Sequence, residues 1–244
     1  MDNFKIRQRS RIAYKNFEKI NVDRPVDRLD FIANFCKGKN VLDLGCLDET
    51  SLIKQNTRHW LHGRISETAK QVVGIDNSLR IPSDAEIITG KNSRIIRQDA
   101  LDVDYSRIGM NHIDALVAGE LIEHLEDATS FLTRIKAKLP GIEFILSTPN
   151  GCSISNFMMG LIGRESQHPD HTCNFTYKTL NTLCLRANLE QWEIVPYKFY
   201  ATEMKLKTDR KYNKALISLV EKIFRALEFM FPLTSFGYIV KGRF

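Results

Sequence analysis

The sequence predicts one α/β domain over residues 1–244, with a doubly wound, mainly parallel sheet covered by helices on both faces. Three observations predict this class. The chain has 244 residues, 43% of them hydrophobic, which suits one domain with a full core. Short apolar runs rich in β-formers recur at residues 40–44, 71–75, 94–96, 113–117 and 143–147. Helical patterns alternate with these runs, as in sheets whose parallel strands are joined by crossover helices.

The helices are predicted from their start signals and apolar periodicity. Asp23 is expected to cap a helix with Pro25 in its first turn, ending before Gly38, and residues 1–37 would form an N-terminal helical cap. Further helices are expected at residues 57–70 and at 127–139, the second capped by Asp127. After residue 174 the pattern predicts a helix to 187, a strand at 190–195 and a last strand at 237–241.

Two insertions interrupt this alternation. Residues 151–170 contain an apolar stretch, 154–162, which we interpret as a lid over the acceptor pocket; an apolar lid favours a hydrophobic or lipid-linked substrate. Residues 197–233 form a basic amphipathic insertion. Polar residues recur there every three or four positions, namely Lys211, Lys214, Ser218, Glu221, Lys222, Arg225 and Glu228. Such a helix suits either a bilayer interface or packing against the core or a partner subunit.

Composition excludes some classes of protein. The five cysteines have no Cys-x-x-Cys pair, which argues against a disulfide framework or a structural zinc site and favours a cytoplasmic protein. No uncharged apolar stretch approaches the roughly 20 residues of a spanning helix. Residues 1–20 carry a net charge of +4 and residues 205–244 of +6, whereas the segment between them carries −4. Basic ends indicate an anionic partner surface, either membrane or nucleic acid.

Small and acidic residues follow successive predicted strands. Gly45 comes directly after the first strand, Asp76 ends the second and Asp99 follows the third. A glycine there admits close approach of a ligand to the backbone, and an acid at the end of the second strand can accept hydrogen bonds from a ribose diol. In series, these motifs resemble those of the class I S-adenosylmethionine-dependent methyltransferases, and the resemblance spans residues 38–190.

The resemblance implies a set of cofactor-binding residues. Asp43, Gly45, Cys46 and Leu47 correspond to the motif against the methionine part, although the family's second and third glycines are missing. Asp76 corresponds to the ribose ligand, Asn77 lies beside it near the adenine, and Asp99 and Ala100 correspond to positions at the adenine amino edge. Gly119 and Glu120 correspond to the exit of the fourth strand. The family's Rossmann-like sheet has seven strands, six parallel and one reversed, and its cofactor is S-adenosyl-L-methionine.

The acceptor side is expected after the fourth strand. If residues 120–124 turn helically, Glu120, Glu123 and His124 share one face, and His171 can join them from the loop after the fifth strand. This set suits a divalent metal such as Mg²⁺ or Mn²⁺. Without a metal, His124 or His171 would act as a general base. A third interpretation gives these residues a structural role in the pocket.

Three functional hypotheses follow. The first is O-methylation of a small-molecule, glycan or lipid-linked acceptor, in the cytoplasm or peripherally at the inner face of a membrane. It rests on a resemblance to the O-methyltransferases of ubiquinone biosynthesis and of bacterial glycan clusters. The second is metal-dependent RNA 2′-O-methylation, which shares the Glu, Glu, His and His pattern but is weakened by Asn174, where that branch often has an aromatic. The third is a non-catalytic docking module, suggested by the missing glycines. The acceptor and the oligomeric state stay open.

Overall fold

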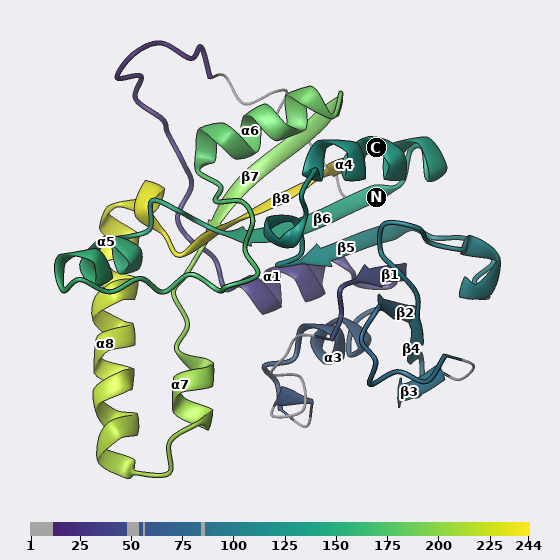
Figure 1. Cartoon of the computed structure of the whole chain (residues 1–244), viewed down its shortest axis with the longest axis horizontal. Coiled ribbons are helices and arrows are strands. Elements are labelled where there is room, and N and C mark those ends of the chain that lie inside the picture. The colour runs from purple at the N-terminus through teal and green to yellow at the C-terminus, as the bar shows by residue number, and fades with distance from the viewer. Residues whose placement is uncertain (1–11, 48–53, 56, 84–85) are drawn as a thin grey trace.

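A computed structural model describes residues 12–47, 54–55, 57–83 and 86–244, which form one eight-stranded sheet with helices on both faces (Figure 1). The strands are β1 (Asn40–Leu44), β2 (Gln71–Asp76), β3 (Glu86–Gly90), β4 (Ser93–Arg97), β5 (Ala115–Gly119), β6 (Glu143–Pro149), β7 (Gln191–Tyr197) and β8 (Gly237–Arg243). The α-helices are α1 (Arg28–Phe35), α3 (Leu61–Ser66), α4 (Ala128–Lys138), α5 (Ile154–Leu161), α6 (Tyr177–Arg186), α7 (Thr202–Leu206) and α8 (Lys211–Met230). Short 3-10 turns are η1 (Tyr105–Ile108), η2 (Ile122–His124) and η3 (Pro232–Thr234).

The strand order across the sheet is β3-β4-β2-β1-β5-β6-β8-β7. Neighbours from β4 to β6 pair in parallel, whereas β8 lies antiparallel between β6 and β7. From β1, strands β2 and β4 extend the sheet toward one edge, whereas β5 and β6 extend it toward the other. The strand order therefore reverses between β1 and β5. Because ligands of such sheets bind outside the carboxyl ends of the strands where the order reverses, the topology directs attention to the ends of β1 and β5.

The expected count of seven strands is wrong. The additional strand is β3, which pairs antiparallel with β4 at the edge of the sheet. Its residues alternate between exposed and half-buried, as expected of an edge strand that covers the core with one face. Residues 91–92 join β3 to β4 as a tight hairpin, so the predicted strand at 94–96 is the second half of a two-stranded unit.

The core lies on both faces of the sheet, which confirms the doubly wound α/β class. All five residues of β1 are buried, as are most of β2, β5 and β6. Phe131 of α4 and Leu180 of α6 belong to the cluster on one face, and Ile32 of α1 and Ile65 of α3 to the cluster on the other. Figure 1 shows these two helix pairs on opposite sides of the strands.

Two helices begin later than the sequence predicts. The first is capped by Asp27, which accepts a hydrogen bond from the backbone N–H of Asp30, and the predicted cap at Asp23 is wrong. The intervening Val26 is extended because it bridges to Tyr197 of β7. The helix expected at 57–70 is limited to α3, since Trp60 is extended before it. Of the proposed N-terminal cap, residues 1–11, with most of its positive charge, lie outside the described residues.

The 197–233 insertion begins one residue later than predicted, because Tyr197 closes β7. It contains α7 and α8. The long helix α8 buries two acidic side chains, Glu221 and Glu228, and leaves most of its large apolar side chains exposed. None of the described helices is long and apolar enough to cross a membrane.

Candidate functional site

A cavity of about 1080 Å³ opens at the carboxyl ends of β1, β2 and β5. All the residues that the sequence singled out line it, namely Asp43, Gly45, Cys46, Leu47, Asp76, Asn77, Asp99, Ala100, Gly119, Glu120, Glu123, His124 and His171. These residues lie at or after the ends of five strands, β1, β2, β4, β5 and β6, and span 129 positions of the sequence, from residue 43 to residue 171; the parallel sheet brings them together. The volume lies slightly above the usual range for small-ligand pockets, so it has room for a cofactor and part of an acceptor.

The turn after β1 depends on Gly45. Its φ of +67° lies in the left-handed region, and a side chain there would bring its Cβ within 3.0 Å of Leu121. The next carbonyl, that of Cys46, accepts a hydrogen bond from the indole N–H of Trp60 at 3.1 Å. The turn is therefore held by packing and by an indole that lies 14 positions later, without the second and third glycines of the usual motif. Asp48 lies outside the described residues.

Asp43 makes a buried pair with His62. The two side chains are almost completely buried, and Nδ1 of His62 lies 2.9 Å from Oδ2 of Asp43. The other ring nitrogen of His62 lies 3.0 Å from the hydroxyl of Thr89 in β3. The pair links the core of β1 to α3 and β3 directly beneath the turn. No local pattern in the sequence marks the pairing of His62 with Asp43, which lies 19 positions earlier.

The carboxylate of Asp76 fixes the same turn from the second strand. Its Oδ2 accepts a hydrogen bond from the backbone N–H of Leu47 at 2.9 Å, and its Oδ1 accepts one from Ser78. Each carboxylate oxygen has a second lone pair, so Asp76 can still accept a hydrogen bond from a ligand hydroxyl. Asp76 therefore acts as a loop cap and also presents its acceptor atoms to the cavity.

Asp99 and Ala100 lie at the end of β4. Oδ1 of Asp99 accepts a hydrogen bond from the backbone N–H of Leu101 at 2.8 Å, which fixes the carboxylate in the loop. The side chain of Asp99 is exposed toward the cavity that Asn77 also lines. The neighbouring strands β2 and β4 are thus each associated with a carboxylate, Asp76 at the end of β2 and Asp99 just after β4, as the sequence predicted.

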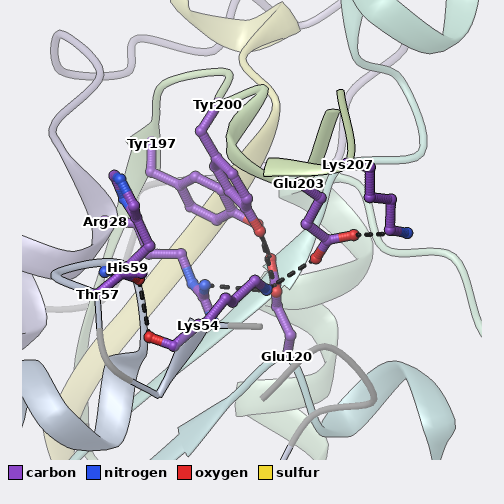
Figure 2. Close-up of polar contacts among 9 residues, drawn as sticks. All are labelled: Arg28, Lys54, Thr57, His59, Glu120, Tyr197, Tyr200, Glu203 and Lys207. Carbon is purple, nitrogen blue, oxygen red and sulfur yellow. Dashed lines mark hydrogen bonds and ion pairs between the residues drawn. The ribbon is translucent and has the colours of Figure 1, made fainter. Parts of the chain in front are cut away.

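Glu120 is the most strongly held side chain of the site (Figure 2). Its backbone has a φ of +57°, a conformation that is uncommon for a residue with a side chain and is a marker of functional positions. Its carboxylate accepts hydrogen bonds from the hydroxyls of Tyr197 and Tyr200, both at 2.9 Å, and forms an ion pair with Arg28 at 3.4 Å. Burial opposes the charge of Arg28, but Glu120 outweighs it and raises the pKa of the guanidinium. Burial and the nearby Glu120 raise the pKa of Tyr200.

Residues of the 197–233 insertion form another part of the cavity wall. Lys54, which is buried, donates a hydrogen bond to Glu203 of α7 at 2.7 Å and so joins the segment after β1 to this wall (Figure 2). Glu221 and Arg225 of α8 line the same cavity and pair with each other at 2.8 Å. The wall is therefore made of paired charges.

Glu123 is buried without a partner. Its side chain is 1% exposed, and neither carboxylate oxygen has a hydrogen-bond partner among the described residues. Burial, and secondarily the charge of Glu120, raise its pKa to about 8, so the carboxyl is mainly protonated at neutral pH. The expected single helical face is wrong, because Glu120 has left-handed backbone and η2 begins only at Ile122.

Three histidines meet at the mouth of the cavity. The rings of His124 and His171 are 4.7 Å apart between centroids, and that of His168 is 5.9 Å from His124 and 5.6 Å from His171. One ring nitrogen from each lies within 4.8 Å of the others, close enough to hold one metal ion. Burial and the neighbouring histidines lower the pKa of His171, so its imidazole is neutral at neutral pH. His168 was not among the predicted ligands, although its spacing from His171 was visible in the sequence.

The predicted lid, residues 151–170, turns its polar side chains toward the cavity. Ser153, Asn156 and His168 line the cavity, whereas Phe157 and Leu161 of α5 are exposed on the outside. The apolar side chains Phe157 and Leu161 therefore do not line the cavity, contrary to the interpretation of residues 154–162 as an apolar lid over the acceptor pocket. This part of the cavity is therefore lined by polar side chains.

The sequence matches no protein-family model, and no curated protein matches it. Solved structures match it across most of its length. A SAM-dependent methyltransferase from Archaeoglobus fulgidus is 17% identical with a TM-score of 0.50, over 88% of this chain and 90% of that one. The methyltransferase domain of bacterial-CtHen1-CN is 17% identical with a TM-score of 0.52, over 89% and 98%. The small RNA methyltransferase HEN1 is 13% identical with a TM-score of 0.53, over 93% of this chain and 27% of that protein.

These likenesses, together with the strand order, establish the fold: the chain has the class I S-adenosylmethionine-dependent methyltransferase fold, with an added edge strand β3. The resemblance drawn from the sequence motifs is confirmed at this level. Because one fold supports many chemistries, the activity must be argued from the site.

Proposed function

We propose that the protein is an S-adenosylmethionine-dependent methyltransferase that methylates a hydroxyl oxygen of a small-molecule, glycan or lipid-linked acceptor. One observation carries the proposal. A single cavity joins the carboxylates at the ends of β2 and β4 to the histidines after β5 and β6, at the point where the strand order reverses. The carboxylates suit hydrogen bonding to a nucleoside, and the histidines suit proton transfer or metal binding.

The described residues fit the cofactor. Asp76 would hold the ribose, Asn77 would lie near the adenine, and Asp99 would contact the adenine amino edge. Asp76 keeps acceptor capacity after capping the turn, and Gly45 admits a ligand close to the backbone. When bound, S-adenosylmethionine supplies a methyl group made electrophilic by its positive sulfur. Glu120, fixed by two tyrosines and Arg28 at the end of β5, lines the same cavity and would favour the binding of a positively charged ligand.

In this reaction the residues of the protein would have two tasks, to remove the hydroxyl proton and to position the acceptor. With the cofactor bound, the acceptor oxygen would form a bond to the methyl carbon as the carbon–sulfur bond breaks with its electron pair going to sulfur, and the hydroxyl proton would have to leave. The neutral imidazole of His171, with His124 beside it, is available to take that proton. Positioning the hydroxyl in line with the methyl group accounts for most of the expected acceleration.

A divalent metal is the second way to activate the hydroxyl. His124, His168 and His171 would hold it, and its chemistry would be to lower the pKa of the acceptor hydroxyl. Three imidazoles favour Mn²⁺ over Mg²⁺, which prefers oxygen ligands. Glu120 and Glu123, which the sequence offered as further ligands, line the same cavity but do not belong to this group among the described residues.

RNA 2′-O-methylation is the alternative acceptor chemistry. The group of three histidines and the likeness to a small RNA methyltransferase favour it, and the positive charge of residues 205–244 is compatible with it. Neutralising phosphates would make the affinity for RNA fall steeply with salt. An affinity that does not change between low and physiological salt would remove this alternative.

The acceptor class is tested with methyl-labelled cofactor and three separate acceptor pools: lipid extract, glycan fraction and short RNA. We expect label in the lipid or glycan pool, and a loss of at least about 100-fold with His171→Ala. His112→Ala is the matched control, because His112 is exposed and does not line the cavity. Label in RNA alone would overturn the proposed acceptor class.

A further inference from the structure

The long helix α8 is attached to the protein by its charged face. Glu228 is completely buried and accepts a hydrogen bond from the backbone N–H of Phe199 at 2.8 Å. Glu221 is buried as well and pairs with Lys205 of α7 and with Arg225. Phe224 packs toward the body against Phe199, with 5.0 Å between ring centroids. Polar groups and one aromatic therefore make up most of the face that an ordinary surface helix would fill with apolar side chains.

The apolar stripe of α8 consequently faces outward. The exposed large apolar side chains on and just after the helix are Tyr212, Leu216, Leu219, Val220, Ile223, Phe229, Met230 and Phe231. Most recur every three or four positions, so they form one stripe along the helix. Ile223 is 51% exposed and Phe231 is 58% exposed. Soluble monomers rarely leave a contiguous apolar surface of this kind uncovered.

A second element extends this surface. Helix α5 lies against α8, and its exposed side chains Phe157, Met158 and Leu161, followed by Ile162, are also apolar. Figure 1 shows α8 at the outer side of the molecule, with α5 near its C-terminal end and α7 alongside. We call the exposed apolar side chains of residues 157–162 and 212–231 the outer apolar surface. Two segments about 50 residues apart in sequence contribute to it, so the surface extends beyond a single helix.

The charge beside the outer apolar surface is positive. Its exposed basic residues are Lys207, Arg210, Lys211, Lys214 and Lys222, and the one exposed acid described among residues 207–222 is Asp209. At 100° per residue, Lys211 and Lys222 border the apolar stripe along one side. Lysines in this position can reach lipid headgroups while their stems lie along the apolar side chains. A second copy of the chain would instead place two basic borders against each other.

We infer that the outer apolar surface docks on an anionic phospholipid bilayer, with α8 lying in the plane of the interface. Apolar side chains would enter the boundary between headgroups and acyl chains, and the lysines would contact anionic headgroups. The inward face of α8 contributes Glu221 and Arg225 to the cavity wall, so docking would hold the cavity about one helix diameter from the bilayer. An acceptor with a lipid tail and a polar head could then reach the polar cavity; this last step rests on the proposed methyl transfer.

Vesicle sedimentation tests the docking without cofactor or acceptor, so its result is independent of the proposed activity. The probes are vesicles of phosphatidylcholine with one quarter phosphatidylglycerol, and vesicles of phosphatidylcholine alone. We expect the protein to sediment with the anionic vesicles at low salt and at least about tenfold less with the neutral ones, since each basic residue near an anionic surface contributes roughly fivefold.

Three variants sharpen the test. Ile223→Asp is expected to weaken sedimentation at least about tenfold. Lys211→Glu with Lys222→Glu should weaken it about 25-fold or more at low salt. Ile88→Asp is the matched control, because Ile88 is 65% exposed on β3 at the other edge of the sheet, and it should change nothing. Circular dichroism checks that each variant is folded.

Two results would overturn the inference. One is the absence of sedimentation with anionic vesicles at low salt. The other is a stable dimer in light scattering that Ile223→Asp converts to monomers, which would assign the outer apolar surface to a second copy of the chain.

Discussion

The carboxylate of Glu120 accepts hydrogen bonds from the hydroxyl of Tyr200 through both of its oxygens, at 2.9 and 3.1 Å. The two residues lie 80 positions apart, one at the end of β5 and the other just after β7. With Tyr197 and Arg28, this contact fixes the Glu120 carboxylate in the lining of the cavity and connects the sheet to the 197–233 insertion. The geometry of the acceptor side thus depends on contacts from three distant parts of the chain.

Removing the cation from this group should destabilise the fold. Arg28→Met leaves Glu120 without its ion pair, and we expect the free energy of unfolding to fall by about 1 to 3 kcal/mol. The value lies below that of a fully buried pair because Glu120 is partly exposed. Chemical denaturation measures it. In Arg134→Met, which breaks an exposed pair spanning 3.9 Å, the change should stay under about 0.5 kcal/mol. Equal losses in the two variants would refute the special role of Arg28.

Breaking the buried pair of Asp43 and His62 should destabilise the fold. His62→Ala removes a fully buried partner of Asp43 and leaves a cavity, so we expect a loss of about 2 to 4 kcal/mol in unfolding free energy. His112→Ala is the matched control: His112 is an exposed histidine 2.9 Å from the amide of Asn40 and 3.2 Å from Asp114, and the variant should cost no more than about 1 kcal/mol. An unchanged melting temperature in His62→Ala would contradict the assignment.

The strand ends were predictable from sequence, and their surroundings were not. Asp43, Gly45, Asp76, Asp99 and Glu120 follow apolar runs, and in a parallel sheet such positions must converge. This geometric rule needs no knowledge of distant contacts, which is why every predicted site residue lines one cavity.

The residues that hold the site come from far along the chain. The bridge between Val26 and Tyr197 of β7 brings Arg28 near the two tyrosines, and no local pattern marks these residues as partners of Glu120. The edge strand β3 was missed because Ile87 and Ile88 are the only strongly apolar residues of its five, a weaker signal than the apolar runs of the inner strands. His168 was visible as a neighbour of His171, but only the folded loop brings it to His124.

The buried Glu228 should make the protein less stable as the pH rises. Burial raises its pKa from 4.5 to about 7, so the folded state resists ionisation that the unfolded chain accepts. Stability is therefore lost between pH 4.5 and 7, and the cost persists above pH 7. We expect Glu228→Gln to raise the free energy of unfolding by on the order of 2 kcal/mol at pH 8, with a gain that shrinks toward pH 4.5. Glu126→Gln, on the surface, should change it by less than about 0.5 kcal/mol at either pH. A gain that does not vary with pH would be inconsistent with this account.

The three histidines should bind Mn²⁺. Paramagnetic resonance of added Mn²⁺ measures binding directly, without any acceptor. We expect bound metal in the unmodified protein and a loss of about 10- to 100-fold in affinity with His168→Ala. His59→Ala is the control, because His59 lines the same cavity away from the cluster. If Mn²⁺ does not bind, the metal-free route through His171 remains as the way to remove the proton.

The central claim, that the cavity binds S-adenosylmethionine, is tested most directly by calorimetric titration of the protein with this cofactor. The account predicts saturable binding that Asp99→Asn weakens about tenfold or more and that Asp102→Asn leaves unchanged. Asp102 is a matched control, since it is an exposed aspartate three positions later that does not line the cavity. Absence of binding to the folded protein would contradict the claim and would favour a docking module that keeps only the fold.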